Sequence, residues 1–317
     1  MTLQEAIARH LESLTVRNFA KNTLINRAYQ LRFFHRFLDE HEPPVQEIER
    51  VTAELLVEFQ SWLFHQPTPK GAVRGVANQN RIFTGLRGFF AFLKTNGYLT
   101  VNPAEALANG REPRRLPRSV LTVMEAKRIL DAVDTGRVEG YRDRTILEVF
   151  YATGIRKQEL LDLRVQHVSL EEELLRIEQG KGGHDRVVPL SRVACRFLET
   201  YLKAIRPELV GGSGRKDQGQ PAERLFISAR GKPLNKNVLS EIIAHYVKQA
   251  KVKKHITCHS WRHTCATHLL KNRANLRHVQ EILGHRSLAT TERYLHLTIT
   301  DLKEAHRRFH PREKGVD

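Results

Sequence analysis

Cysteine is scarce in this sequence: Cys195, Cys258 and Cys265 are its 3 cysteines among 317 residues. An odd and scattered set provides no disulfide framework, so we expect a reducing compartment such as the cytoplasm. No apolar run approaches the roughly 20 residues that span a bilayer, so we expect no membrane segment. The first residues lack a basic stretch followed by an apolar one, so we expect no export signal.

Acidic residues are too few to balance the basic ones. The chain has 52 Lys and Arg against 35 Asp and Glu, a net charge of +17. Such an excess is typical of proteins that bind nucleic acid or another anionic surface. Residues 1–108 carry 12 basic and 10 acidic side chains, so most of the excess lies further along the chain.

The apolar pattern predicts two domains joined by a basic linker. Residues 1–108 repeat apolar side chains at helical spacing, so we expect a helical domain there. Residues 109–119 contain two prolines and one glycine, which disfavour a helix, and four arginines. Residues 120–317 alternate between helical and strand-like patterns, so the fold is expected to be mainly α with a small antiparallel β-sheet.

Local signals predict where several elements begin. Thr2-x-x-Glu5 and Thr122-x-x-Glu125 are capping boxes, in which the two side chains bond to backbone amides at a helix start. Lys21-Asn22-Thr23 is expected to cap another helix. Three short runs with alternating apolar residues predict strands at 165–170, 174–177 and 186–190.

Several polar motifs in the second domain suit phosphate chemistry. Guanidiniums bind phosphate through two donors, imidazoles transfer protons near neutral pH, and a lysine can donate a proton. A tyrosine with a pKa of about 10 needs such neighbours to attack a phosphodiester. The motifs are Gly154-Ile155-Arg156-x-x-Glu159, Gly180-Lys181-Gly182, His259-x-x-Arg262, Leu283-Gly284-His285 and Tyr294.

In this order and spacing, the five motifs resemble the tyrosine recombinase (phage integrase) family, including its Xer-type members. The resemblance covers residues 120–317 as the α+β catalytic domain. Residues 1–108 are similar, more loosely, to the family's helical, SAM-like core-binding domain. The resemblance implies an enzyme that cuts and rejoins DNA through a 3′-phosphotyrosine intermediate and a Holliday junction. Such an enzyme would integrate, excise or resolve a mobile element or replicon.

The resemblance also implies a role for each motif residue. Tyr294 would be the nucleophile, and two arginines would hold the scissile phosphate. Lys181 would protonate the leaving 5′ oxygen, His259 would act in proton transfer, and His285 would hydrogen-bond a phosphate oxygen. The two arginines are Arg156 and Arg262, and Glu159 would support Arg156.

The expected partners are double-stranded DNA at a specific recombination site and further copies of the chain. The resemblance implies a homo-tetramer on synapsed DNA, in which Leu302 and Phe309 dock on a neighbouring subunit unless they pack within their own. Accessory DNA-binding proteins could take part. Some basic side chains are expected to contact the DNA phosphates, and the alternative is that they are merely solvated. The candidates are Lys21, Arg81, Arg87, Arg114, Arg115 and Arg118.

Taken alone, each motif has a simpler interpretation. Arg156 could pair only with Glu159, and Lys181 could be an ordinary hairpin tip. His259 and His263 have a spacing that also occurs at metal sites, but no carboxylate or cysteine is well placed to complete one. The glycine-rich turn lacks the pattern of a nucleotide-binding loop. We therefore expect no metal and no other cofactor.

Three further residues and three other activities bear on this interpretation. His268 is expected to be a packed core histidine, and Trp261 and Cys265 to affect only the packing behind the site. A type IB topoisomerase has almost the same catalytic set. A catalytically silent DNA-binding regulator should lack a motif residue, and a metal-dependent nuclease would fail in EDTA. The complete set of motifs favours a recombinase.

Overall fold

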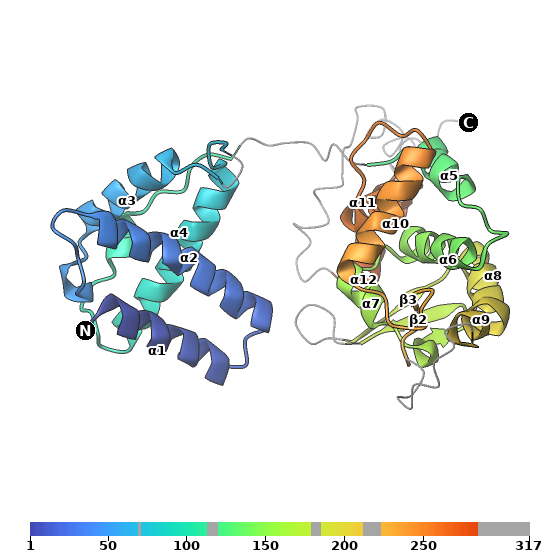
Figure 1. Ribbon diagram of the computed structural model, residues 1–317, viewed down its shortest axis with the longest axis horizontal. Helices are drawn as coiled ribbons and strands as arrows, with labels where there is room; N and C mark the ends of the chain where they lie inside the picture. Colours follow the sequence, from blue (N-terminus) through green and yellow to red (C-terminus); the bar gives the residue numbers. More distant parts are fainter. Residues whose placement is uncertain (69–70, 113–119, 179–184, 212–222, 285–317) are drawn as a thin grey trace, which may run out of the picture. The chain divides into compact units, whose positions relative to one another are not determined.

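The computed structural model describes residues 1–68, 71–112, 120–178, 185–211 and 223–284. The chain forms two compact units, Met1–Arg114 and Arg115–Asp317 (Figure 1). The first is helical, and the second combines helices with a small antiparallel sheet. The predicted fold class, mainly α with a small antiparallel sheet, is confirmed. Within these residues, no helix is long and apolar enough to cross a membrane.

The first unit is a helical bundle around a core rich in phenylalanine. The ring of Phe34 meets the edges of Phe59 and Phe90 at centroid distances of 5.3 and 5.7 Å. All three side chains are fully buried, which is the main source of stability for such a bundle. Its described helices are α1 (Leu3–Val16), α2 (Lys21–Glu40), α3 (Ala53–His65) and α4 (Val76–Thr95), with 3₁₀ turns at Ile48–Arg50 and Pro103–Ala106.

The predicted start of α1 is confirmed, but the predicted cap of α2 is wrong. Thr2 and Glu5 form a complete capping box. Helix α2 instead begins directly after Ala20, with no hydrogen bond from a side chain to its first amides. The segment Lys21-Asn22-Thr23 is already helical, because the apolar face of α2 packs into the core and determines the helix more strongly than a cap does.

The second unit is organised around helix α6 (Val138–Thr153). Of its 16 residues, 10 are buried, and it packs against both α8 and α11. A helix that is covered on nearly all sides forms the centre of a domain. The helices described around it are α5 (Val123–Asp131), α7 (Lys157–Asp162), α8 (Arg192–Thr200), α9 (Arg206–Gly211), α10 (Lys236–Gln249), α11 (Cys258–Lys271) and α12 (Leu276–Leu283). Shorter turns span Val165–His167 and Tyr201–Ile205.

The sheet of the second unit has the strand order β1-β2-β3 and is antiparallel throughout its described residues. The strands are β1 (Val168–Ser169), β2 (Leu174–Ile177) and β3 (Arg186–Pro189). The prediction for β2 is confirmed, whereas β1 is shorter than predicted because residues 165–167 form a 3₁₀ turn. Ile177 pairs with Arg186 at the end of the β2–β3 hairpin. The tip, residues 179–184, lies outside the described residues.

Candidate functional site

The turn between α6 and α7 presents Arg156. Helix α6 ends at Gly154, whose φ of +57° lies in the left-handed region that glycine adopts without strain. A Cβ at this position would also lie 2.8 Å from Cδ2 of Leu283. Ile155 is fully buried and anchors the turn. The next residue, Arg156, therefore caps the start of α7 at a defined place.

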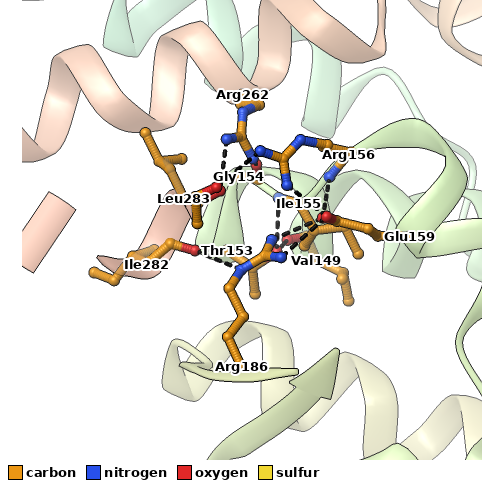
Figure 2. A network of polar contacts seen from close by, with 11 residues as sticks. Val149, Thr153, Gly154, Ile155, Arg156, Glu159, Arg186, Arg262, Ile282 and Leu283 are labelled. Atoms are coloured by element: carbon orange, nitrogen blue, oxygen red, sulfur yellow. Dashed lines mark hydrogen bonds and ion pairs between the residues drawn. The ribbon is translucent and has the colours of Figure 1, made fainter. Parts of the chain in front are cut away.

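Helix α11 contributes His259 and Arg262, which lie one turn apart on one face. The side chain of Arg262 is almost completely buried, with 1% exposure. Its Nη1 donates to the carbonyl of Gly154 at 2.8 Å and its Nη2 to the carbonyl of Leu283 at 2.6 Å (Figure 2). These carbonyls stabilise a buried guanidinium and join α11 to the ends of α6 and α12.

Arg156, His259 and Arg262 line one open pocket of about 450 Å³. Lys157 also lines it, and its Nζ donates to Oγ of Ser240 on α10 at 2.6 Å. Two guanidiniums in one partly buried pocket create a positive potential that favours an anion. The arrangement can bind a phosphate group and stabilise further negative charge on it.

Two of the three histidines on α11, His259 and His263, are held in their neutral forms at the pocket end of the helix. Burial, and then the charges of Arg262 and Arg156, lower the pKa of His259 below its usual 6.5. Burial also lowers the pKa of His263 to about 4, and the two rings meet edge to face at 4.4 Å. A neutral imidazole in the pocket can accept a proton at neutral pH.

A third arginine, Arg186, belongs to the same network. Its Nη1 and Nη2 donate to the two carboxylate oxygens of Glu159 at 3.0 and 2.7 Å, and its Nε donates to the carbonyl of Ile282 at 3.2 Å (Figure 2). Glu159 also accepts from Nη1 of Arg156 at 2.6 Å. Burial favours a raised pKa for Glu159, but the hydrogen bonds from Arg186 and Arg156 outweigh it and lower the pKa to about 2.

The sequence interpretation missed Arg186. The available signal was its position at the start of β3, five residues after Lys181 in the sequence. A single sequence with 52 basic residues does not reveal which of them pairs with Glu159. The pairing depends on how the hairpin packs against α7 and α12, which is a property of the folded chain.

The structure brings together four of the residues predicted for the site: Arg156, Glu159, His259 and Arg262. Lys181, His285 and Tyr294 lie outside the described residues, as do Arg114, Arg115, Arg118, Leu302 and Phe309. Lys21 and Arg81 are exposed on α2 and α4. Arg87 is half-buried and donates to the carbonyl of Leu107 at 2.5 Å and to Oδ1 of Asn109 at 3.1 Å.

Behind the pocket, α11 is packed closely against α6. His268 is half-buried, accepts a hydrogen bond from the Tyr151 hydroxyl at 2.9 Å and donates to the carbonyl of Leu121 at 2.9 Å. Trp261 is fully buried. Burial raises the pKa of the Cys265 thiol to about 12. These side chains fix the helix that carries His259.

Comparisons with known proteins identify the family of this chain. Residues 119–300 match the model of the phage integrase family. Tyrosine recombinase XerD of Staphylococcus aureus is 32% identical over 98% of this chain and 100% of its own length. Tyrosine recombinase XerC 2 of Ralstonia nicotianae is 32% identical over 98% of this chain and 87% of its own.

Solved structures show the same fold. The XerA recombinase aligns with a TM-score of 0.51 and 26% identity over 97% of this chain and 99% of its own. The XerH recombinase, in a post-cleavage complex with a palindromic difH substrate, aligns with a TM-score of 0.71 and 23% identity over 92% of this chain and 81% of its own. The family model covers more than half of the sequence, and the curated relatives cover nearly all of it. This chain therefore belongs to the phage integrase family and is a tyrosine recombinase, an enzyme that breaks and rejoins DNA strands.

Proposed function

We propose that this enzyme performs conservative site-specific recombination on double-stranded DNA, through 3′-phosphotyrosine intermediates and a Holliday junction. The observation that carries the proposal is the single pocket lined by Arg156, His259 and Arg262. Three side chains, two from α11 and one from the turn before α7, converge there, and each has a chemical use in phosphoryl transfer. The motif residues outside the described part of the chain complete the set.

In the proposed cleavage step, the phenolic oxygen of Tyr294 attacks the scissile phosphorus. A bond from this oxygen to phosphorus forms while the bond from phosphorus to the 5′ oxygen breaks. His259 accepts the phenolic proton, and its lowered pKa keeps it neutral for this purpose. Lys181 donates a proton to the leaving 5′ oxygen, and His285 hydrogen-bonds a non-bridging phosphate oxygen.

The two arginines stabilise the charge that develops on the non-bridging oxygens. Arg262 is buried and held by two carbonyls, so it needs little reorganisation when the charge forms. Arg156, which lines the same pocket, is held by an ion pair with Glu159. Rejoining reverses the reaction: a 5′ hydroxyl attacks the phosphotyrosine and Tyr294 leaves. The ester retains the bond energy, so no nucleotide needs to be hydrolysed.

We assign DNA binding to the whole chain. Residues 1–108 act as the core-binding domain, residues 109–119 as a basic linker along the phosphate backbone, and residues 120–317 as the catalytic domain. Lys21 and Arg81 are exposed and can contact phosphates. Arg87 instead donates a hydrogen bond to the carbonyl of Leu107, near the end of the first unit. We also propose that the enzyme is cytoplasmic and acts on DNA there.

We further propose a homo-tetramer on synapsed DNA, with Leu302 and Phe309 docking on the neighbouring subunit. A lambda integrase tetramer has been solved bound to a Holliday junction, and it shares this fold with a TM-score of 0.69 at 22% identity. Four protomers acting in pairs would exchange the strands in turn. Accessory DNA-binding proteins would act on the assembled complex.

The nucleophile provides the direct test. The first probe is sheared genomic DNA from the organism that carries the gene, because covalent adducts trapped with SDS reveal the cleaved site by sequencing. The wild-type enzyme should form such adducts, and Tyr294→Phe should bind the recovered site without forming any. Adducts that persist in Tyr294→Phe, or their absence from the wild type, would contradict the proposal.

The recovered site also separates recombination from related activities. Plasmids with two copies of the site should yield recombinant products in EDTA. Relaxation of supercoils without recombinants would instead indicate a type IB topoisomerase, and loss of activity in EDTA a metal-dependent nuclease.

A further inference from the structure

The carboxylate of Glu159 is shared by two arginines. Oε1 accepts from Nη1 of Arg156 and Nη1 of Arg186, and Oε2 accepts from the backbone N–H of Arg156 and Nη2 of Arg186 (Figure 2). Each oxygen therefore has two donors, one from each arginine. Such a carboxylate cannot rotate without losing several charge-assisted hydrogen bonds.

We propose that Arg186 is a positioning residue for DNA cleavage, which acts on Arg156 through Glu159. This inference rests on the proposed function, because it concerns the same reaction. Arg186 lines no part of the pocket described for Arg156, His259 and Arg262. Its effect on the reaction is to hold Glu159, which in turn fixes both the backbone and the side chain of Arg156.

The charges give Arg186 a second effect. Arg156 and Glu159 alone would form a neutral pair, which would offer little attraction to a phosphate. With Arg186 the cluster has a net charge of +1, and Arg156 keeps more of its positive potential. The side chains of Arg186 and Glu159 are only 12% and 6% exposed, so water screens this interaction weakly.

Arg186 also supports the turn at the end of α12. Its Nε donates to the carbonyl of Ile282, and Nη2 of Arg156 donates to the carbonyl of Gly284 at 3.0 Å. A Cβ at Gly284 would lie 3.0 Å from Cδ and Nε of Arg186, so this side chain lies directly against the turn. The next residue in the sequence is His285. Arg186 thus joins the β2–β3 hairpin, the start of α7 and the turn before His285.

The variants Arg186→Gln and Arg186→Lys test the role of Arg186. Gln removes the charge, whereas Lys keeps the charge but loses the fork that binds both carboxylate oxygens. The matched control is Arg192→Gln, which removes an exposed arginine whose Nε lies 4.0 Å from Glu173 in the same unit. The readout is the single-turnover rate of covalent adduct formation on a nicked duplex of the recovered site, well below the unfolding temperature.

We expect Arg186→Gln to slow adduct formation by about 10- to 100-fold, because Arg156 is misplaced and its potential reduced. Arg186→Lys should be intermediate, and DNA affinity in a gel-shift assay should change little for either. The control should cleave within about twofold of the wild-type rate. A wild-type rate in Arg186→Gln would overturn the inference.

A double-mutant cycle separates positioning from a general loss of stability. If Arg186 acts through Glu159, Arg186→Gln should slow adduct formation much less in a Glu159→Gln background than in the wild type. If the two losses multiply, the role assigned to Arg186 is wrong. Adduct formation by the wild type and its loss in Tyr294→Phe test the proposed function separately, so the two failures are distinguishable.

Discussion

At the level of single residues, the ionisation of His259 decides whether the pocket contains a base. Burial and the two neighbouring arginines lower its pKa below 6.5, so it is neutral at pH 7. As the pH falls through this lowered pKa, the ring becomes protonated and can no longer accept the phenolic proton. In the pH–rate profile, the rate should therefore begin to fall only at a pH below the usual pKa of histidine.

This gives a pH prediction for cleavage. The single-turnover rate of adduct formation should change little between about pH 7.5 and about pH 6.5 and fall at lower pH. His259→Gln should cleave more slowly and lack this acid limb. The comparison of the two rate profiles is the measurement, and an unchanged limb in His259→Gln would assign the titration to another group.

The glycine that ends α12 offers a second prediction. Gly284→Ala would place a left-handed φ of +64° on alanine and press its Cβ against Arg186, 3.0 Å away. Gly97→Ala is the control, since Gly97 has a φ of +73° but nothing within 4 Å of its Cβ. Both should lose about 1–3 kcal/mol of stability, by thermal unfolding. Gly284→Ala alone should also slow adduct formation, and equal cleavage rates in both variants would contradict the contact with Arg186.

At the level of elements, the sequence predicted what local signals determine. Strand β2 was predicted correctly because its apolar alternation matches a half-buried strand, and α1 because Thr2 and Glu5 form a local capping box. The cap of α2 was wrong because tertiary packing outweighed the local signal. The Arg186–Glu159 pair joins positions far apart in the sequence, so no local pattern could show it.

The packing of α1 against α4 predicts a sensitivity to acid. His10 on α1 is 3% exposed and contacts the rings of Phe89 and Phe92, and neither of its ring nitrogens has a hydrogen-bond partner among the described residues. Burial, and then the charges of Arg27 and Arg17, lower its pKa to about 4. The unfolded chain therefore binds a proton that the folded one does not between pH 6.5 and 4. Stability from this group is complete above the unfolded pKa and is lost as the pH falls through this window.

The expected loss is about 2 kcal/mol between about pH 7.5 and about pH 5. His10→Leu places an apolar side chain at this buried position and removes the titration. Urea unfolding of the full chain at the two pH values should show a smaller pH dependence for His10→Leu than for the wild type. The same pH dependence in both proteins would show that His10 is not responsible.

At the scale of the whole molecule, the net charge of +17 should govern how binding responds to salt. Each basic side chain that neutralises a phosphate releases a counterion, which contributes about 0.9 to the slope of log affinity against log salt. If three of the four linker arginines, Arg114, Arg115 and Arg118, lie along the backbone, replacing these three by Gln should reduce the slope by up to about 3. The measurement is a series of gel shifts on the recovered site at increasing salt.

A control with the same loss of charge distinguishes direct contacts from the general field of the protein. Arg192, Arg196 and Lys203 are exposed on α8 and the turn that follows, and none of them lines the pocket. Their replacement by Gln should alter the slope much less, because distant exposed charges are screened by salt. Phosphate contacts position the protein without performing the chemistry, so DNA bound by the linker variant should still be cleaved at nearly the wild-type single-turnover rate. Equal slopes for the two triple variants would mean that the linker makes no special contact with the backbone.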